Sequence, residues 1–132
     1  MTGLLYIAVG FLLAAAYIAV AAAAGGDSRR KMIFAVGLVV AAAIYLGFGS
    51  FSNSVNWILI ETLGVVVYTG IAVLGYKRSA WFLSFGWASH VLWDTVLHNA
   101  STDFVPFWYQ MLCVGFDLPT AFYIEYREWR AK

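Results

Sequence analysis

The stretch that decides the fold class is "GLLYIAVGFLLAAAYIAVAAAA", residues 3–24. It contains no charged residue, and a helix needs about 20 mostly apolar residues to cross the hydrocarbon core of a bilayer. Small residues follow the run, as in a secretory signal peptide, but there is no basic n-region and the apolar run is longer than the usual signal core. We therefore interpret residues 3–24 as a membrane-spanning helix.

The rest of the chain has the same character. Of its 132 residues, 63% are hydrophobic and 11% are charged, whereas a soluble domain carries about 25% charged residues. The net charge of +1 provides no basic surface for nucleic acid, and the single cysteine excludes an internal disulfide. The length predicts one domain over residues 1–132, and the composition makes the lipid bilayer its main partner.

Five segments are long and apolar enough to be membrane spans. They cover residues 3–24, 32–50, 55–76, 80–99 and 104–124. Their apolar runs are continuous and do not alternate as the strands of a membrane β-barrel do. The predicted fold class is therefore all-α, a polytopic membrane bundle of five transmembrane helices.

The basic residues give this bundle an orientation. With five spans, all eight fall on one side of the membrane, and neither the two opposite loops nor the N-terminus contains any. They are Arg29, Arg30, Lys31, Lys77, Arg78, Arg127, Arg130 and Lys132. Because Lys and Arg collect on the cytoplasmic side, we predict an N-terminus outside and a C-terminus in the cytoplasm of a multi-pass cell-membrane protein.

Five ionisable side chains lie within the predicted spans: Glu61, His90, Asp94, His98 and Asp117. A charged side chain at the centre of a membrane helix costs about 2.5 to 3.5 kcal/mol on insertion scales. Such a cost must be offset by a partner, a proton, a metal or water. Intramembrane ionisable residues are for this reason candidates for a functional site.

Helical geometry indicates that these groups can meet. His90, Asp94 and His98 are spaced by four residues and fall within an arc of about 80° on one helix. At a rise of about 1.5 Å per residue, His90 lies about 14 Å and Asp117 about 19 Å from the outer ends of their spans. The sequence predicts a polar pocket that opens outward and ends near mid-membrane. The same faces also include Gly64, Tyr68, Trp87, Gln110, Cys113 and Thr120. Trp87 and Trp93 lie deeper than interfacial anchoring explains.

Acid/base chemistry is one use of this pocket. A histidine beside a carboxylate exchanges protons near neutral pH. The catalytic candidates are His90 and Asp94 as acid and base, Asp117 as the deep charge, and Glu61 and Tyr109 as supporting groups.

A divalent transition metal is the other use. Imidazole and carboxylate four residues apart on a helix reach one ion together, and such a ligand set suits zinc or iron. The metal candidates are His90, Asp94, His98 and Asp117. His90 and His98 are about 12 Å apart along the helix axis, so Asp94 with one histidine and a carboxylate from another helix is the better set. No residue is assigned to any other cofactor.

Two segments, "GWASHVLWDTVLHN" (86–99) and "VPFWYQMLCVGFDLPTAFY" (105–123), resemble a family of small bacterial integral membrane proteins of unknown function. The likeness consists of the His-x-x-Trp-Asp-x-x-x-His helix, the Pro-x-Trp-Tyr start of the last span and its Phe-Asp pair. It implies a bacterial inner membrane and supports the choice of residues, but no activity. A looser similarity connects the His/Asp cluster with ceramidase-type membrane hydrolases, which are larger and carry more histidines.

Three classes of function remain open. The first is a membrane enzyme that acts on a lipid-like or small apolar substrate from the outward-opening pocket. The second is a proton- or cation-coupled transporter, working as a homo-oligomer because five short helices enclose little volume. The third is a structural or accessory subunit, in which the acids are protonated and only join helices.

Overall fold

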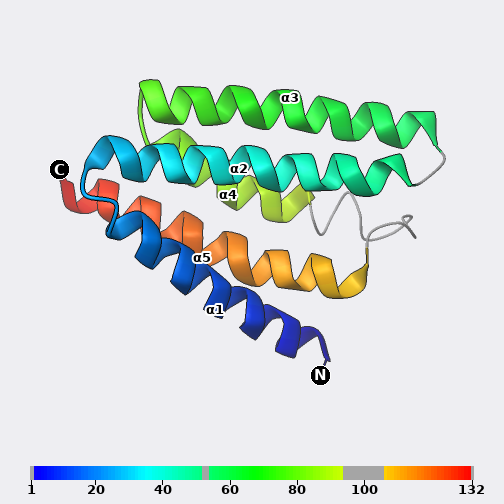
Figure 1. Cartoon of the computed structure of the whole chain (residues 1–132), viewed down its shortest axis with the longest axis horizontal. Coiled ribbons are helices and arrows are strands. Elements are labelled where there is room, and N and C mark those ends of the chain that lie inside the picture. Colours follow the sequence, from blue (N-terminus) through cyan, green and yellow to red (C-terminus); the bar gives the residue numbers. More distant parts are fainter. Residues whose placement is uncertain (1, 52–53, 94–105, 132) are drawn as a thin grey trace.

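The structure is a computed structural model that describes residues 2–51, 54–93 and 106–131. This part of the chain is all-α, as predicted. Its five helices run in alternating directions (Figure 1). Their bounds are α1 (Thr2–Ala22), α2 (Asp27–Ser50), α3 (Val55–Lys77), α4 (Trp81–Leu92) and α5 (Phe107–Ala131).

Three helices of the described part are long and apolar enough to cross a membrane, namely α1, α2 and α3. They indicate a multi-pass membrane protein. The described part of α4 has 12 residues, and α5 has 25 residues that include a charged C-terminal third. The spans predicted at 80–99 and 104–124 therefore stay predictions.

Two helix boundaries differ from the predicted spans. Gly25 takes a φ of 78°, a conformation that glycine adopts without strain, and α2 then begins at Asp27 rather than near residue 32. Asp27, which precedes the predicted span, lies in the first helical turn and pairs with Arg30 and Lys31. Hydropathy locates where an apolar run begins, whereas these ion pairs extend the helix into its polar flank.

The C-terminal helix also outlasts its span. α5 continues to Ala131, beyond the predicted limit at residue 124. Along this extension the guanidinium of Arg130 donates to the Tyr126 hydroxyl at 3.1 Å and lies over the Tyr126 ring. The charged residues after the apolar run thus form a helical continuation outside it.

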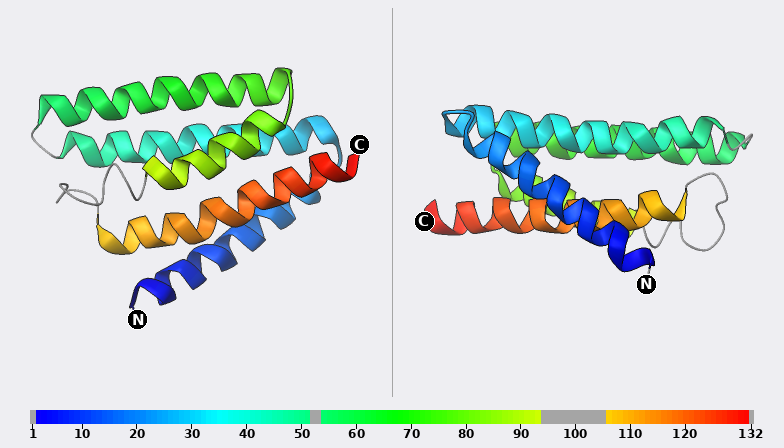
Figure 2. Two further views of the ribbon diagram at one scale, coloured as in Figure 1. Left: turned by 180° about the vertical axis from the view of Figure 1, so that it is seen from behind. Right: turned by 60° about the horizontal axis from the view of Figure 1, so that its bottom comes forward.

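α1 crosses the bundle obliquely. Its C-terminal end meets α2 at the turn between them, and its length lies along α5 (Figure 2). The backbones of α1 and α5 touch: a Cβ on Gly10 would lie 2.0 Å from the carbonyl oxygen of Leu112, and one on Gly115 would lie 2.0 Å from that of Ile7. Small residues permit this close approach in membrane helices. α2 therefore diverges from α1 beyond their shared turn.

The core joins all five helices and combines small and aliphatic side chains with a few aromatic ones. Trp87 of α4 is 1% exposed, and its indole N–H donates to the carbonyl oxygen of Phe34 at 3.2 Å. The rings of Tyr17 and Phe116 pack against the Trp87 ring. This contact explains one of the two deep tryptophans that interfacial anchoring left unexplained.

Candidate active site

The site is centred on His90 of α4 and Asp117 of α5. Nδ1 of His90 lies 3.0 Å from Oδ2 of Asp117, a distance at which the ring N–H donates to the carboxylate. His90 is completely buried and Asp117 is 2% exposed. The structure thus brings together two of the predicted site residues from different helices.

The helices deliver both groups by simple periodicity. Trp87 and His90 are three residues apart on the buried face of α4, and Asp117 shares the buried face of α5 with Gln110, Cys113 and Thr120. Pro119 lies inside α5 two residues after Asp117 and cannot donate to a preceding carbonyl. The polar face predicted for α5, and the described part of the one predicted for α4, are therefore turned into the bundle.

Burial gives the pair its chemical character. An isolated charge is costly in a low-dielectric interior, and a partner that shares a proton with it lowers the cost. A histidine and a carboxylate in contact, screened from bulk water, form a unit that accepts a proton from one group and passes it to another. The arrangement is suited to acid/base chemistry.

Two tyrosines flank the imidazole. The ring centroids of Tyr68 and Tyr45 lie 5.0 Å and 5.6 Å from that of His90. Tyr109, predicted as a supporting group, contacts Tyr45 at a centroid distance of 5.7 Å. Sequence reasoning missed Tyr45 as a site residue. A signal existed, because a tyrosine in an otherwise apolar span needs a partner for its hydroxyl when it is buried.

Glu61 forms a second contact, with Trp93. The indole N–H of Trp93, the residue that follows α4, donates to Oε1 of Glu61 at 3.0 Å. Glu61 is 1% exposed, and Gly64 makes room for the indole, because a Cβ there would lie 2.6 Å from Trp93. The Tyr68 ring contacts both Trp93 and His90. Glu61 is thus connected to His90 through aromatic side chains.

An apolar groove reaches the pair. It has a volume of about 580 Å³ and lies between α1 and α2, with α5 and Trp87 at its floor. Its lining is almost entirely apolar, and Tyr109, Cys113 and Asp117 are among its few polar residues. Asp117 therefore belongs both to the buried pair and to the wall of the groove.

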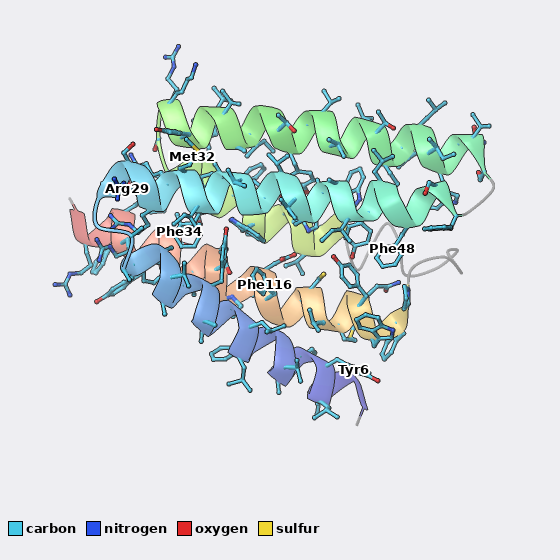
Figure 3. All side chains as sticks on the ribbon, viewed as in Figure 1. Tyr6, Arg29, Met32, Phe34, Phe48 and Phe116 are labelled. Atoms are coloured by element: carbon cyan, nitrogen blue, oxygen red, sulfur yellow. The ribbon has the colours of Figure 1, made fainter. Side chains whose placement is uncertain are left out.

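Tyr17 crosses this groove from α1. Its hydroxyl donates to the carbonyl oxygen of Ile33 on α2, and its ring packs on Phe34 and Phe116, which project from α2 and α5 (Figure 3). Gly37 permits the crossing, since a Cβ there would lie 1.9 Å from the Tyr17 hydroxyl. The hydrogen bond from Tyr17 to Ile33 thus bridges the groove.

Comparison with known proteins identifies the family. A model described as a family of unknown function (DUF6010) matches residues 5–129. The chain belongs to DUF6010. No curated protein and no solved structure matches it. The DUF6010 match runs from α1 into the end of α5, so it covers far more than the two segments in which a resemblance to an uncharacterised membrane family was visible. Any function must be inferred from the site.

The remaining predicted site residues, Asp94 and His98, lie outside the described residues. Within residues 2–51, 54–93 and 106–131, no group of three or more His, Cys, Asp or Glu side chains could hold a metal ion. His90 and Asp117 supply two candidate ligands there. A zinc or iron centre in this DUF6010 chain stays a prediction that requires further ligands.

Proposed function

We propose that this chain is a membrane enzyme that acts on a lipid-like or small apolar substrate by acid/base chemistry at His90 and Asp117. One observation carries the proposal: Asp117 is hydrogen-bonded to His90 and also lines the apolar groove. A contact that only joined helices would not need to face a cavity.

The groove limits the substrate class. Ligand sites have volumes of about 300 to 1,000 Å³ and combine apolar walls with a few polar groups that fix orientation. The groove, at about 580 Å³, meets both conditions. Because α1 and α2 are both membrane-spanning candidates, a molecule can enter between them from within the bilayer. An acyl or isoprenoid chain is the substrate body that this lining suits.

The roles of the residues follow from their places. Asp117 faces the groove and exchanges the proton with the substrate, while His90 behind it orients the carboxylate and shares its proton. Tyr109 lines the same groove and donates from its hydroxyl to a polar group of the substrate. Asp94, next in sequence to Trp93, and His98 are proposed to complete the site.

We also propose five spans with the N-terminus outside. The α1–α2 turn, the α3–α4 connection and the end of α5 lie at the same end of the bundle (Figure 1). Described basic residues gather there: Arg29, Arg30, Lys31, Lys77, Arg78, Arg127 and Arg130. The positive-inside rule assigns this end to the cytoplasm, in agreement with residence in a cell membrane.

The test is the lipid composition of a host that expresses the full chain. We expect the wild type to deplete one apolar species and to form another, and Asp117→Asn and His90→Gln to abolish that change. Asp27→Asn, an acid-to-amide change at the exposed end of α2, is the matched control. A folded Asp117→Asn protein with the wild-type lipid profile would overturn the proposal.

The alternative with zinc or iron has its own readout. Elemental analysis of the purified chain would then give about one metal per protein, and the metal would be lost with Asp117→Asn. Metal-free wild-type protein that still converts the apolar species would leave the acid/base proposal in place and exclude the metal.

A further inference from the structure

A ridge on α2 separates two grooves. Met32, Val36 and Val40, at four-residue steps, are each about half exposed, at 46%, 52% and 50%, and line both grooves. On one side lies the groove that reaches Asp117. On the other lies a groove of about 510 Å³ between α2 and α3, with Val73 in its wall and Lys77 at its basic end.

The basic end of this second groove is polar. A cavity of about 440 Å³ adjoins it, shares Met32 and Tyr76 with it, and adds Ser28 and Arg29. The hydroxyls of Ser28 and Tyr76 lie 3.0 Å apart and connect α2 to α3. Arg29 and Met32 both lie at this end of α2 (Figure 3). The apolar groove between α2 and α3 therefore ends at a group of hydroxyl and basic side chains.

The basic residues at this end differ in their ion pairing. Asp27 pairs with Arg30 and Lys31. In the described part of the chain, no carboxylate lies within ion-pair distance of Arg29 or Lys77. Arg29 lines the cavity together with Ser28 and Tyr76, and Lys77 lines the adjoining groove together with Tyr76. Basic groups beside hydroxyls at a membrane surface are the pattern that recognises an anion.

We propose that this surface binds an anionic phospholipid from the leaflet at the basic end of the bundle. The lipid phosphate lies between Arg29 and Lys77 with the Ser28 and Tyr76 hydroxyls as further hydrogen-bonding groups. One acyl chain lies in the groove between α2 and α3. The ridge from Met32 to Val40 is about 12 Å long, close to the depth of about 15 Å of one leaflet. The site is independent of His90 and Asp117.

Native mass spectrometry of the full chain tests the proposal. The protein is extracted from nanodiscs made of equal amounts of phosphatidylglycerol and phosphatidylcholine with identical acyl chains. We expect the wild type to retain phosphatidylglycerol in preference. Arg29→Gln and Lys77→Gln should each lower the ratio of the two retained lipids by about fivefold. Arg130→Gln, a basic residue at the same end but outside the cavity, should leave the ratio unchanged.

A second pair of variants tests the acyl-chain groove. Val73→Trp fills the groove while Arg29 and Lys77 are both retained, and it should reduce the retained phosphatidylglycerol. Val66→Trp, on an exposed part of α3 outside the groove, should not. Asp117→Asn should retain the lipid as the wild type does, which separates this site from the proposed enzyme.

Two outcomes would overturn the proposal. A wild-type ratio equal to that of the nanodisc would mean that ordinary annular lipid covers the surface. An equal loss for Arg130→Gln and Arg29→Gln would mean that the attraction is the general positive charge of this end.

Discussion

His90 and Asp117 join α4 to α5 through a 3.0 Å contact between Nδ1 and Oδ2, and neither side chain has appreciable contact with solvent. Removal of one partner from such a buried pair strands the other and costs about 3 to 5 kcal/mol. We expect His90→Ala to lower the free energy of unfolding by this amount. Unfolding in detergent, followed by circular dichroism, measures the loss.

The double variant His90→Leu/Asp117→Leu is the control for that experiment. Since it removes both polar groups together, we expect it to be more stable than His90→Ala. A double variant as unstable as the single one would mean that the site tolerates no apolar replacement and that the cost is one of packing.

The Glu61–Trp93 contact makes a separate prediction. Glu61→Gln keeps an oxygen that accepts from the indole N–H. Glu61→Ala leaves that half-buried donor without its acceptor, at a cost toward the lower end of about 1 to 3 kcal/mol. We expect only the alanine variant to have a lower free energy of unfolding than the wild type, measured by unfolding in detergent. Thr62→Val, at the exposed neighbouring position on α3, should behave as the wild type; equal losses for Gln and Ala would contradict the assigned role of the oxygen.

Gly37 is predicted to be intolerant of even a methyl group. In Gly37→Ala the new Cβ would lie 1.9 Å from the Tyr17 hydroxyl. The Tyr17 side chain, which is hydrogen-bonded to Ile33, must therefore move, with a cost of about 1 to 3 kcal/mol for overpacking. Gly70→Ala is the matched control, because nothing lies within 4 Å of its Cβ and alanine favours the helix by about 0.5 to 1 kcal/mol. The two thermal unfolding midpoints should shift in opposite directions.

The contact of α1 with α5 gives a more severe case. A Cβ on Gly115 would meet the backbone oxygen of Ile7, which cannot turn aside as a side chain does. We expect Gly115→Ala to destabilise the chain more than Gly37→Ala, while Gly47→Ala, with open space around it, should be slightly more stable than the wild type for the same reason as Gly70→Ala. Equal stability of Gly115→Ala and the wild type would show that α1 does not lie against α5.

Cysteine labelling tests the orientation in the membrane. In a Cys113→Ala background, an impermeant maleimide should label Asn56→Cys, near the start of α3, in intact cells. Ser28→Cys, at the opposite end near the start of α2, should react only after permeabilisation. The reverse pattern would place the basic end outside and contradict the positive-inside assignment.

Periodicity was enough to predict which side chains share a face. Tyr68 with Glu61, Trp87 with His90, and Thr120 with Asp117 are all buried on the faces that helical spacing assigns to them. Helical spacing depends only on positions along the chain, so it can be determined from a single sequence. The membrane character follows in the same way from the apolar runs of α1, α2 and α3.

Contacts between helices could not be obtained in this way. Two examples are the hydrogen bond between Glu61 and Trp93 and the ring contact between Tyr45 and His90. Both depend on how each helix is rotated and inclined toward its neighbours. Those angles depend on close approaches between the same helices, such as Gly75 against Leu83 and Gly86 against Leu38, and a hydropathy pattern does not contain them. The groove between α1 and α2 was hidden for the same reason, since it exists because α1 leans on α5.

The direct backbone contact of α1 with α5 has a mechanical consequence. Because no side chains lie between them at Gly10 and Gly115 to rearrange, we expect these two helices to move together as one rigid unit. Widening of the groove would then require α2 to move away from this unit. The short glycine turn allows that movement, and the hydrogen bond from the Tyr17 hydroxyl to Ile33 opposes it.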